Sequence, residues 1–409
     1  MISTSAHLFL KQISQIFSVD KLPLGFLLGA GCPVSVKIPS EGDCSAFAPI
    51  IPDVEGLTTV VIADLKSQLE VEPALQKMLD VLKEDGLENP NIEKILGFVR
   101  TLAAAAGTGV VRGFNADVLK TMDQCICASI FDKVNKTLPA QGTAYHALAQ
   151  FAAPRTKNPI EIFTTNYDLL MEQALESSRV PYFDGFVGSC LPFFDLIAID
   201  QDVLPSRWVR LWKIHGSINW RRHPNDSGRI CRTLNEKSGG ELLIHPSHQK
   251  FDDSRRMPYL AMIDRLKSFI RNDQRPVALI IQGYSFSDDH LNAAIEESLR
   301  SNPHAACFSF QFGDENAYPG AKKMASRCSN VTILARDGVI SKGVSRQWEV
   351  AQSPSYQSIE GFFDWDQGAL EGQSAGTDAK CCLGDFDKFG QFLRSLTGEE
   401  TISSAMVAA

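Results

Sequence analysis

The stretch IEIFTTNYDLLMEQALE, which begins at Ile160, places polar side chains between a run of strand character and a run of helix character. Asn166 can donate and accept hydrogen bonds at once, so it suits a ribose hydroxyl or an attacking water. Asp168 suits the N-terminal cap of the following helix, but capping does not explain Asn166. In an open α/β sheet such a strand exit faces the crevice where ligands bind. The stretch therefore predicts either an ordinary turn or part of a binding site.

A histidine followed by glycine ends a second predicted strand, in LWKIHGSINW at residues 211–220. The ordinary pKa of histidine lies near neutrality, so His215 could act as a general base. A single histidine is more often structural. The neighbouring Gly216 and Ser217 favour a tight turn that exposes the ring, and so favour the catalytic alternative.

A Gly-Ala-Gly turn follows the predicted strand of LLGAGCPVS, residues 27–35. Gly29, Ala30 and Gly31 would let the backbone approach a pyrophosphate, and the next helix could aim free N–H groups at the phosphates. The third glycine of the usual dinucleotide pattern is missing. A simple turn therefore explains these residues as well as a phosphate site does.

The segment ALIIQGYSFSDDHLNAAIEESL, residues 278–299, delivers Gly283 and Ser285 to the edge of the predicted sheet. Asp288 could cap the helix that follows, or its carboxylate could hold ribose hydroxyls. The sequence leaves both interpretations open.

The elements that position these segments are predicted from continuous aliphatic runs, which are typical of strands covered by helices on both faces. The predicted fold is α/β, with a Rossmann-like doubly wound parallel sheet and an inserted helical subdomain. The predicted parts are an N-terminal helical segment (1–20), the Rossmann-like domain (21–56 and 151–350), the helical insertion (57–150), and a loop, C-terminal helix and tail (351–409).

Composition narrows the function. The 409 residues are 44% hydrophobic and carry a net charge of −8, which is typical of a globular protein and disfavours direct binding to nucleic acid. No pair among the ten cysteines has Cys-x-x-Cys spacing, so no metal site and no zinc are expected, and reduced thiols fit the cytoplasm. We find no apolar stretch of membrane-spanning length.

Two further segments are predicted to be contact surfaces. Apolar residues at helical spacing within residues 1–18 predict an amphipathic helix. The aromatic cluster Phe362, Phe363 and Trp365 lies in a region rich in Ser, Gly and Gln, which predicts a loop or docking segment.

Taken together, the four segments resemble the sirtuin superfamily, and in particular its bacterial sirtuin-like branch of defence proteins. The matching pieces occur in family order: Gly-Ala-Gly at 29–31, Thr-Thr-Asn-Tyr-Asp at 164–168, Lys-Ile-His-Gly-Ser-Ile-Asn-Trp at 213–220 and Gly-Tyr-Ser-Phe-Ser-Asp-Asp-His at 283–290. The resemblance spans roughly residues 24 to 300.

The resemblance implies an NAD⁺ hydrolase in which Asn166 and His215 are catalytic. Its implied NAD⁺-binding residues are the turn Gly29, Ala30 and Gly31 for the pyrophosphate, Asp168 for the nicotinamide ribose, and Gly283 and Ser285 for the adenosine side. NAD⁺ would be the substrate, and its depletion would serve anti-phage defence by abortive infection in the bacterial cytoplasm. The implied partners are further copies of the chain, as a homo-oligomer, and a HerA-type hexameric ATPase or helicase.

Two other functions stay open. A module that senses NAD⁺ or ADP-ribose would keep the glycine turn without requiring His215. A protein deacylase is less favoured, because the deacylases carry zinc-binding cysteines and an arginine that KIPSEGDCSAF lacks. His245 and His248, in HPSHQKFDD, indicate a nuclease only weakly because no acidic cluster matches them.

Overall fold

A computed structural model describes residues 3–40, 43–222, 230–233, 242–244, 258–350, 360–365 and 377–398. Within these residues the main feature is a twelve-stranded sheet, and seven neighbouring strands of it run parallel. In spatial order they are β8 (Tyr182–Phe183), β11 (Val209–Lys213), β7 (Glu161–Thr164), β2 (Leu24–Leu28), β15 (Val277–Gln282), β16 (Ala305–Phe310) and β17 (Val331–Leu334).

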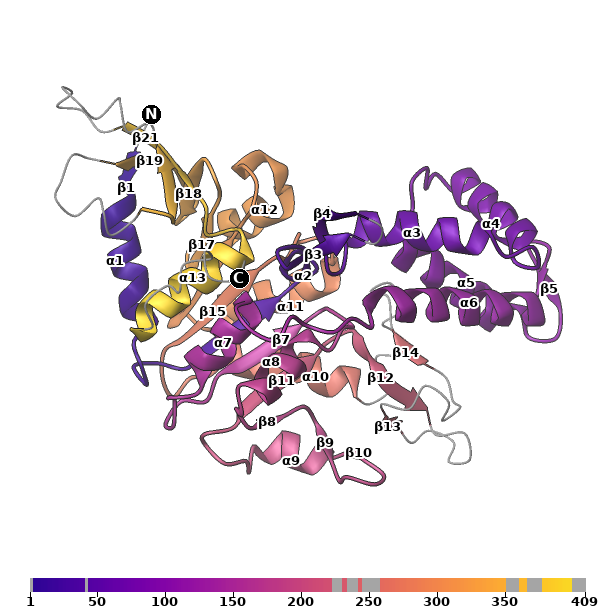
Figure 1. Cartoon of the computed structure of the whole chain (residues 1–409), viewed down its shortest axis with the longest axis horizontal. Coiled ribbons are helices and arrows are strands. Elements are labelled where there is room, and N and C mark those ends of the chain that lie inside the picture. The colour runs from indigo at the N-terminus through magenta and orange to yellow at the C-terminus, as the bar shows by residue number, and fades with distance from the viewer. Residues whose placement is uncertain are drawn as a thin grey trace.

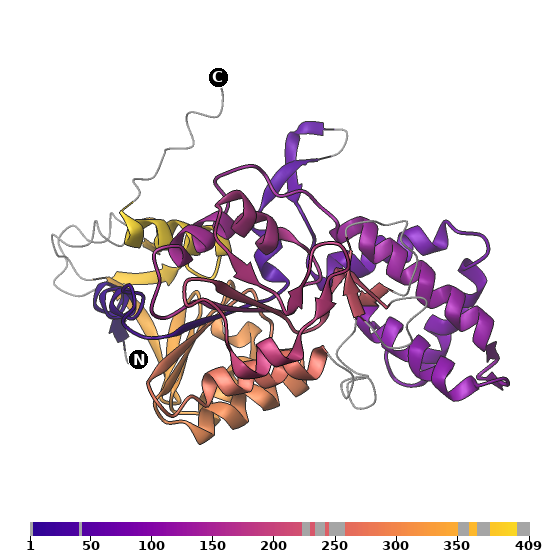
Figure 2. The same cartoon turned by 90° about the horizontal axis from the view of Figure 1, so that it is seen from below.

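The two faces of the parallel strands bury alternate residues in two separate cores, as the two-residue period of a strand requires. In β15, Ala278 and Ile280 belong to one core, whereas Leu279 and Ile281 belong to the other. The first core includes helices α1 (Ala6–Ile16), α7 (Ala144–Ala152), α8 (Leu170–Ser177) and α13 (Phe386–Thr397); the second includes α10 (Tyr259–Ile270), α11 (Asp289–Ser301) and α12 (Pro319–Arg327). Figure 2 shows the sheet between these two layers. The predicted α/β fold with a doubly wound, mostly parallel sheet is confirmed.

An antiparallel extension, which the sequence did not predict, continues the sheet beyond β17. It consists of β18 (Gly338–Ser341), β19 (Val344–Val350), β21 (Thr377–Cys381) and β20 (Phe363–Trp365), while β1 (Ser3–Ser5) pairs with β19 in parallel. The predicted exposed aromatic cluster is wrong for Phe363, which is 2% exposed and packs on Trp348 with ring centroids 5.2 Å apart. Hydrophobic burial against Trp348 therefore orders a segment whose polar neighbours indicated a loop.

The N-terminal segment forms the predicted helix, α1, but most of its apolar side chains belong to the core. Ala6, Leu10 and Ile13 are buried, whereas Leu8 is 59% exposed. Because β1 also pairs with β19, removal of residues 1–18 would strip both a strand and core contacts from the sheet. Within α1, Leu8 is the large apolar residue that stays exposed and so remains a candidate contact residue.

Four helices project from one end of the sheet as a bundle (Figure 1): α3 (Val54–Lys66), α4 (Glu72–Glu84), α5 (Ile92–Ala106) and α6 (Ala116–Val134). A hairpin of β5 (Val110–Val111) and β6 (Phe114–Asn115) joins α5 to α6. Helix α7, which the predicted insertion also included, packs instead against α8 and α13. The domain boundaries drawn from the sequence stay a prediction.

The remaining elements surround the sheet. A smaller antiparallel sheet consists of β14 (Leu242–Ile244), β12 (Gly216–Arg222), β13 (Ile230–Arg232), β10 (Phe193–Phe194) and β9 (Phe186–Val187). The others are α2 (Gly31–Val34), the hairpin β3 (Lys37–Ser40) and β4 (Asp43–Pro49), α9 (Leu196–Gln201) and a 3₁₀ turn (Glu315–Ala317). Among the described residues, no helix has the length and apolar character that a bilayer crossing requires.

Candidate active site

A pocket of about 1440 Å³ lies at the carboxyl ends of the parallel strands and continues against the helical bundle. Small-molecule pockets typically measure about 300–1000 Å³, so this one has room for a dinucleotide. The structure brings nearly all the residues singled out in the sequence to its wall: Ala30, Gly31, Asn166, Asp168, His215, Gly283, Ser285 and Asp288. Gly29 lies just behind the wall, where its carbonyl accepts a hydrogen bond from the Asn166 amide.

The Thr-Thr-Asn stretch after β7 joins two strand ends. Thr164 Oγ1 donates to the carbonyl of Leu28 at 3.1 Å and accepts from the Asn166 N–H at 3.0 Å. Asn166 Nδ2 in turn donates to the Gly29 carbonyl at 3.1 Å. These bonds fix the Asn166 side chain against the glycine turn, so its placement depends on β2 as well as on its own strand.

Gly29 and Gly31 after β2 allow the backbone to contact the turn at Gly283 after β15. A Cβ on Gly29 would lie 2.4 Å from the Gly283 carbonyl oxygen, and a Cβ on Gly283 would lie 2.6 Å from the Cys32 nitrogen. The N–H groups of Gly29 and Gly31 donate to the carbonyls of Gln282 and Gly283, and that of Cys32 donates to Gly29. The expectation that the helix after the turn offers free N–H groups is therefore wrong at Gly31 and Cys32, the first two residues of α2. The glycines are explained by close packing of backbone on backbone.

His215 follows β11 and meets a carboxylate from another segment. Its Nε2 lies 3.1 Å from Asp288 Oδ2, and the two side chains are 5% and 7% exposed. Asp288 also caps α11, because its Oδ1 accepts from the N–H groups of His290 and Leu291. The capping interpretation of Asp288 is confirmed, and the carboxylate has a second partner that the sequence did not reveal.

The loop that carries Asp288 has an unusual backbone. Phe286 is buried and adopts a φ of 60°, a conformation that a bulky residue rarely takes. Its ring packs on Tyr284 with centroids 5.0 Å apart. Ser285 and Ser287 on either side are exposed and lie within hydrogen-bond distance, 2.9 Å between their hydroxyls. Backbone strain of this kind concentrates at functional sites, because the surrounding packing must hold it in place.

A buried ion pair supports the loop beneath Asp168. Lys213 is 1% exposed, and its Nζ lies 2.9 Å from Glu172 Oε1 while donating to the Asp168 carbonyl. Burial raises the pKa of the Asp168 carboxyl, and the charge of Lys213 partly opposes that rise. The pKa of Glu172 is raised for the same reason. Asp168 Oδ1 also accepts from the Leu170 N–H at 3.0 Å, but the cap position of α8 is Leu169, so Asp168 lies one residue before the predicted cap.

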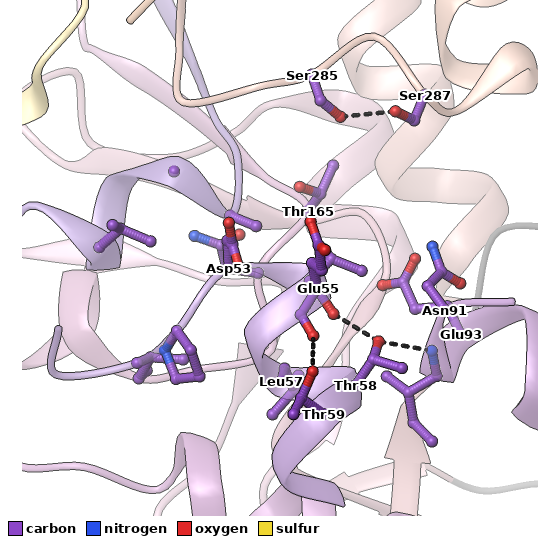
Figure 3. A pocket seen from close by; sticks show the side chains of 18 of the residues that line it. Asp53, Glu55, Leu57, Thr58, Thr59, Asn91, Glu93, Thr165, Ser285 and Ser287 are labelled. Carbon is purple, nitrogen blue, oxygen red and sulfur yellow. Dashed lines mark hydrogen bonds between the residues drawn. The ribbon is translucent and has the colours of Figure 1, made fainter. Parts of the chain in front are cut away.

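The opposite wall of the pocket comes from the helical bundle, and sequence reasoning missed it. Figure 3 shows its polar side chains at the start of α3 and of α5, across the pocket from Ser285 and Ser287. Thr58 Oγ1 accepts from the Ile92 N–H at 2.9 Å and so ties the two helices together. The labelled polar residues of this wall are Asp53, Glu55, Thr58, Thr59, Asn91 and Glu93. Asp53 and Asn91 cap their helices, a signal visible in the sequence that gave no hint of a pocket.

One hydrogen bond joins the two walls. The hydroxyl of Tyr167, which follows Asn166, donates to Glu93 Oε1 at 2.8 Å. Tyr167 is buried and both residues line the pocket. The position of the bundle is therefore coupled directly to the loop that holds Asn166.

The end of the chain supplies a third part of the pocket. Gly384 and Asp385 line it, and a Cβ on Gly384 would lie 2.0 Å from the Gln311 carbonyl oxygen. Asp385 caps α13 by accepting from the Asp387 N–H at 2.9 Å. The sequence showed only that Gly384 and the possible cap Asp385 precede the final helix, and it gave no sign that they line a pocket.

The N-terminal cap residues of four helices therefore line one cavity: those of α3, α5, α11 and α13. Each helix N-terminus carries roughly half a positive charge, which favours anions. Among the described residues that line the pocket there is no arginine, and the lysines are Lys37, Lys66, Lys83 and Lys94. An anionic ligand would depend on these lysines, because the caps Asp53, Asp288 and Asp385 already place carboxylates at three of the helix ends.

Potential metal ligands do not gather in the described part of the chain, where no group of three or more His, Cys, Asp or Glu side chains has the arrangement for an ion. Cys32, beside the glycine turn, is buried, and burial raises the pKa of its thiol. His245 and His248, on which the nuclease interpretation rested, lie outside the described residues.

Comparison with known proteins identifies one part of the chain. Residues 160–330 match the model of a family described as SIR2-like domain, a span that contains Asn166, His215 and Gly283. The predicted sirtuin-like resemblance is confirmed over this span. No curated protein matches the chain.

Solved structures with similar folds include Sir2 proteins. One, from work on the structural basis for the mechanism and regulation of Sir2 enzymes, is 10% identical, with 80% of this chain and 91% of that chain covered and a TM-score of 0.35. A Sir2 homologue in complex with NAD is 14% identical, with 84% and 91% covered and a TM-score of 0.32. A mutant Sir2 homologue in complex with ADP-ribose is 12% identical, with 76% and 87% covered and a TM-score of 0.31.

Proposed function

We propose that this protein is an NAD⁺ hydrolase that cleaves the bond between nicotinamide and ribose. The observation that carries the proposal is that Asn166 and His215, 49 positions apart in a span similar to a SIR2-like domain, line one pocket beside the Gly29–Gly31 turn. The cavity volume suits a dinucleotide.

In the proposed reaction, water replaces nicotinamide at the anomeric carbon of the ribose. The bond to the nicotinamide nitrogen breaks through an oxocarbenium-like state, so the protein must hold the ribose, stabilise positive charge and deliver water. Asn166 positions the water or a ribose hydroxyl, His215 accepts the proton of the water, and Asp168 holds the carboxamide. The products are nicotinamide, ADP-ribose and a proton.

We assign the other predicted residues to NAD⁺ binding. The turn of Gly29, Ala30 and Gly31 supports the pyrophosphate, with Ala30 and Gly31 in the wall and Gly29 behind it. Gly283 and Ser285 hold the adenosine side. This assignment is supported because Ala30, Gly31, Gly283 and Ser285 line the same pocket. Gly29 and Gly283 also have a structural role, because their backbones pack closely together.

We further propose that the hydrolase works in anti-phage defence, as a homo-oligomer in the bacterial cytoplasm with a separately encoded HerA-type hexameric ATPase. This part rests on the resemblance of the four sequence segments alone. NAD⁺ depletion harms the host, so the activity must be restrained until infection. Leu8 on α1 is the exposed apolar residue that we retain as a candidate contact, in place of the buried Phe363.

One experiment tests the proposal: nicotinamide release from NAD⁺ is measured for the purified full chain, alone and with the HerA-type ATPase. We expect release in at least one arm. His215→Ala and Asn166→Ala should each lower the rate about 10²- to 10⁴-fold, because general-base assistance typically contributes that factor. Circular dichroism of both variants should match that of the wild type, although loss of a buried hydrogen-bond partner should lower the melting temperature.

The outcomes separate the competing functions. Near-normal turnover by either variant would contradict the catalytic roles. Binding of NAD⁺ or ADP-ribose without nicotinamide release in any arm would favour a sensing module. Deacetylation of an acetyl-lysine peptide that consumes NAD⁺ would favour the zinc-less deacylase.

A further inference from the structure

His215 and Asp288 form a buried pair at the floor of the pocket, although they come from different segments. The ring follows β11, and the carboxylate precedes α11. Their Nε2 and Oδ2 atoms are 3.1 Å apart, and both side chains line the pocket while remaining almost entirely buried. A charged or polar contact in such a place is strengthened by the low local dielectric.

The carboxylate of Asp288 is held rigidly on its other side. Oδ1 accepts from two backbone N–H groups of α11, those of His290 at 3.0 Å and Leu291 at 3.1 Å. The Tyr284 hydroxyl lies 3.4 Å from the Asp288 carbonyl and donates to Asn292 Oδ1 at 2.9 Å, so a side chain from the strained loop braces the same turn. Oδ1 of Asp288 therefore bonds to the helix, and Oδ2 faces the histidine.

An acceptor opposite Nε2 determines how the ring carries its proton. In neutral imidazole one nitrogen bears a hydrogen and the other is basic. A carboxylate accepts only, so the pair requires the hydrogen on Nε2 and makes Nδ1 the basic nitrogen. When the ring takes up a second proton, the carboxylate also stabilises the positive charge.

We propose that Asp288 is a positioning residue that fixes the tautomer of His215 and stabilises its protonated form during the reaction. The inference rests on the proposed hydrolase function and replaces the expectation that this carboxylate holds ribose hydroxyls. Asp288 acts through the histidine and does not itself touch the substrate.

Asp288→Asn tests this role while sparing the helix cap. Asparagine caps helices as well as aspartate does, so α11 is retained. Its amide donates toward Nε2, however, and so favours the opposite tautomer. In serine proteases the corresponding change lowers kcat about 10⁴-fold with the geometry intact. We expect kcat for nicotinamide release to fall about 10²- to 10⁴-fold with little change in KM.

Asp289→Asn is the matched control, because it removes the same charge from the exposed neighbouring position of the same helix. Its kcat and KM should equal those of the wild type. If Asp288→Asn does not fold, Asp288→Ser replaces it as the test, because serine keeps a capping oxygen and lacks the carboxylate. The same fall in kcat is expected. A folded Asp288→Asn with normal kcat, or with raised KM alone, would overturn the inference.

A readout without turnover separates this inference from the proposed function. Imidazole ¹⁵N chemical shifts distinguish the tautomers, and the His215 signals are those that disappear in His215→Ala. We expect hydrogen on Nε2 in the wild type and a changed pattern in Asp288→Asn. An unchanged pattern contradicts the role of Asp288, whereas a changed pattern in a protein that releases no nicotinamide contradicts only the hydrolase function.

Discussion

The two walls of the pocket are built on different principles. On the sheet wall each polar group is bonded to its neighbours: Asn166 to the Gly29 carbonyl, and His215 to Asp288. On the bundle wall, Asp53 and Asn91 cap helices through hydrogen bonds within the bundle, and Glu55 adds a carboxylate. The sheet wall carries the proposed reaction centre, and the bundle wall closes the pocket from the other side. We infer that chemistry depends on the first wall and substrate retention on the second.

The largest expected effect concerns the rigidity of the sheet wall. Gly29→Ala would place a Cβ 2.4 Å from the Gly283 carbonyl oxygen, a contact that only backbone movement can relieve. Overpacking typically costs about 1–3 kcal/mol and occasionally more, and we expect a value at the top of that range. Urea unfolding measures it. Gly313→Ala is the control, since its Cβ would approach nothing closer than 3.4 Å; equal loss in both variants would refute a tightly packed sheet wall.

The next effect concerns the hydrogen bond from Tyr167 to Glu93, which joins the two walls. Tyr167→Phe removes the hydroxyl that donates to Glu93 and should cost about 1.5–3 kcal/mol of stability, as hydrogen bonds to charged groups do. If the bundle retains substrate, KM for NAD⁺ should rise several-fold while kcat changes little. Tyr182→Phe breaks a similar tyrosine–glutamate bond, 2.7 Å to Glu176 and away from the pocket, and should leave KM unchanged. A fall in kcat alone would place the bundle in the chemistry.

The smallest effect is the pH dependence that Asp168 adds to the sheet wall. Burial raises the pKa of its carboxyl, so the folded protein holds this proton at pH values where the unfolded chain has lost it. The stability that Asp168 contributes is therefore full below its ordinary pKa and falls as the pH rises through the raised pKa. Asp168→Asn should remove this fall, so its melting temperature should gain on the wild type from pH 4 to pH 7. Asp195→Asn, the same substitution at a less buried carboxylate, is the control.

Sequence reasoning reached the sheet wall and missed the rest for a physical reason. Each motif around Gly29, Asn166, His215 and Gly283 follows its own strand, and the carboxyl ends of parallel strands share one edge, so local patterns were enough. The bundle wall depends on how α3 and α5 pack against that edge, and no local pattern records such packing. The burial of Phe363 against Trp348 is likewise a long-range contact. The bond between His215 and Asp288 joins residues 73 positions apart and became visible only in three dimensions.

The closing of the pocket by Gly384 and Asp385 has a consequence for the order in which the protein is made. The Asn166 and His215 segments emerge from the ribosome long before the turn that leads into α13, so a nascent chain can assemble most of its sheet while one side of the cavity is still open. The cavity is therefore complete only after the segment of Gly384 and Asp385 has packed against the segments that carry Asn166 and His215.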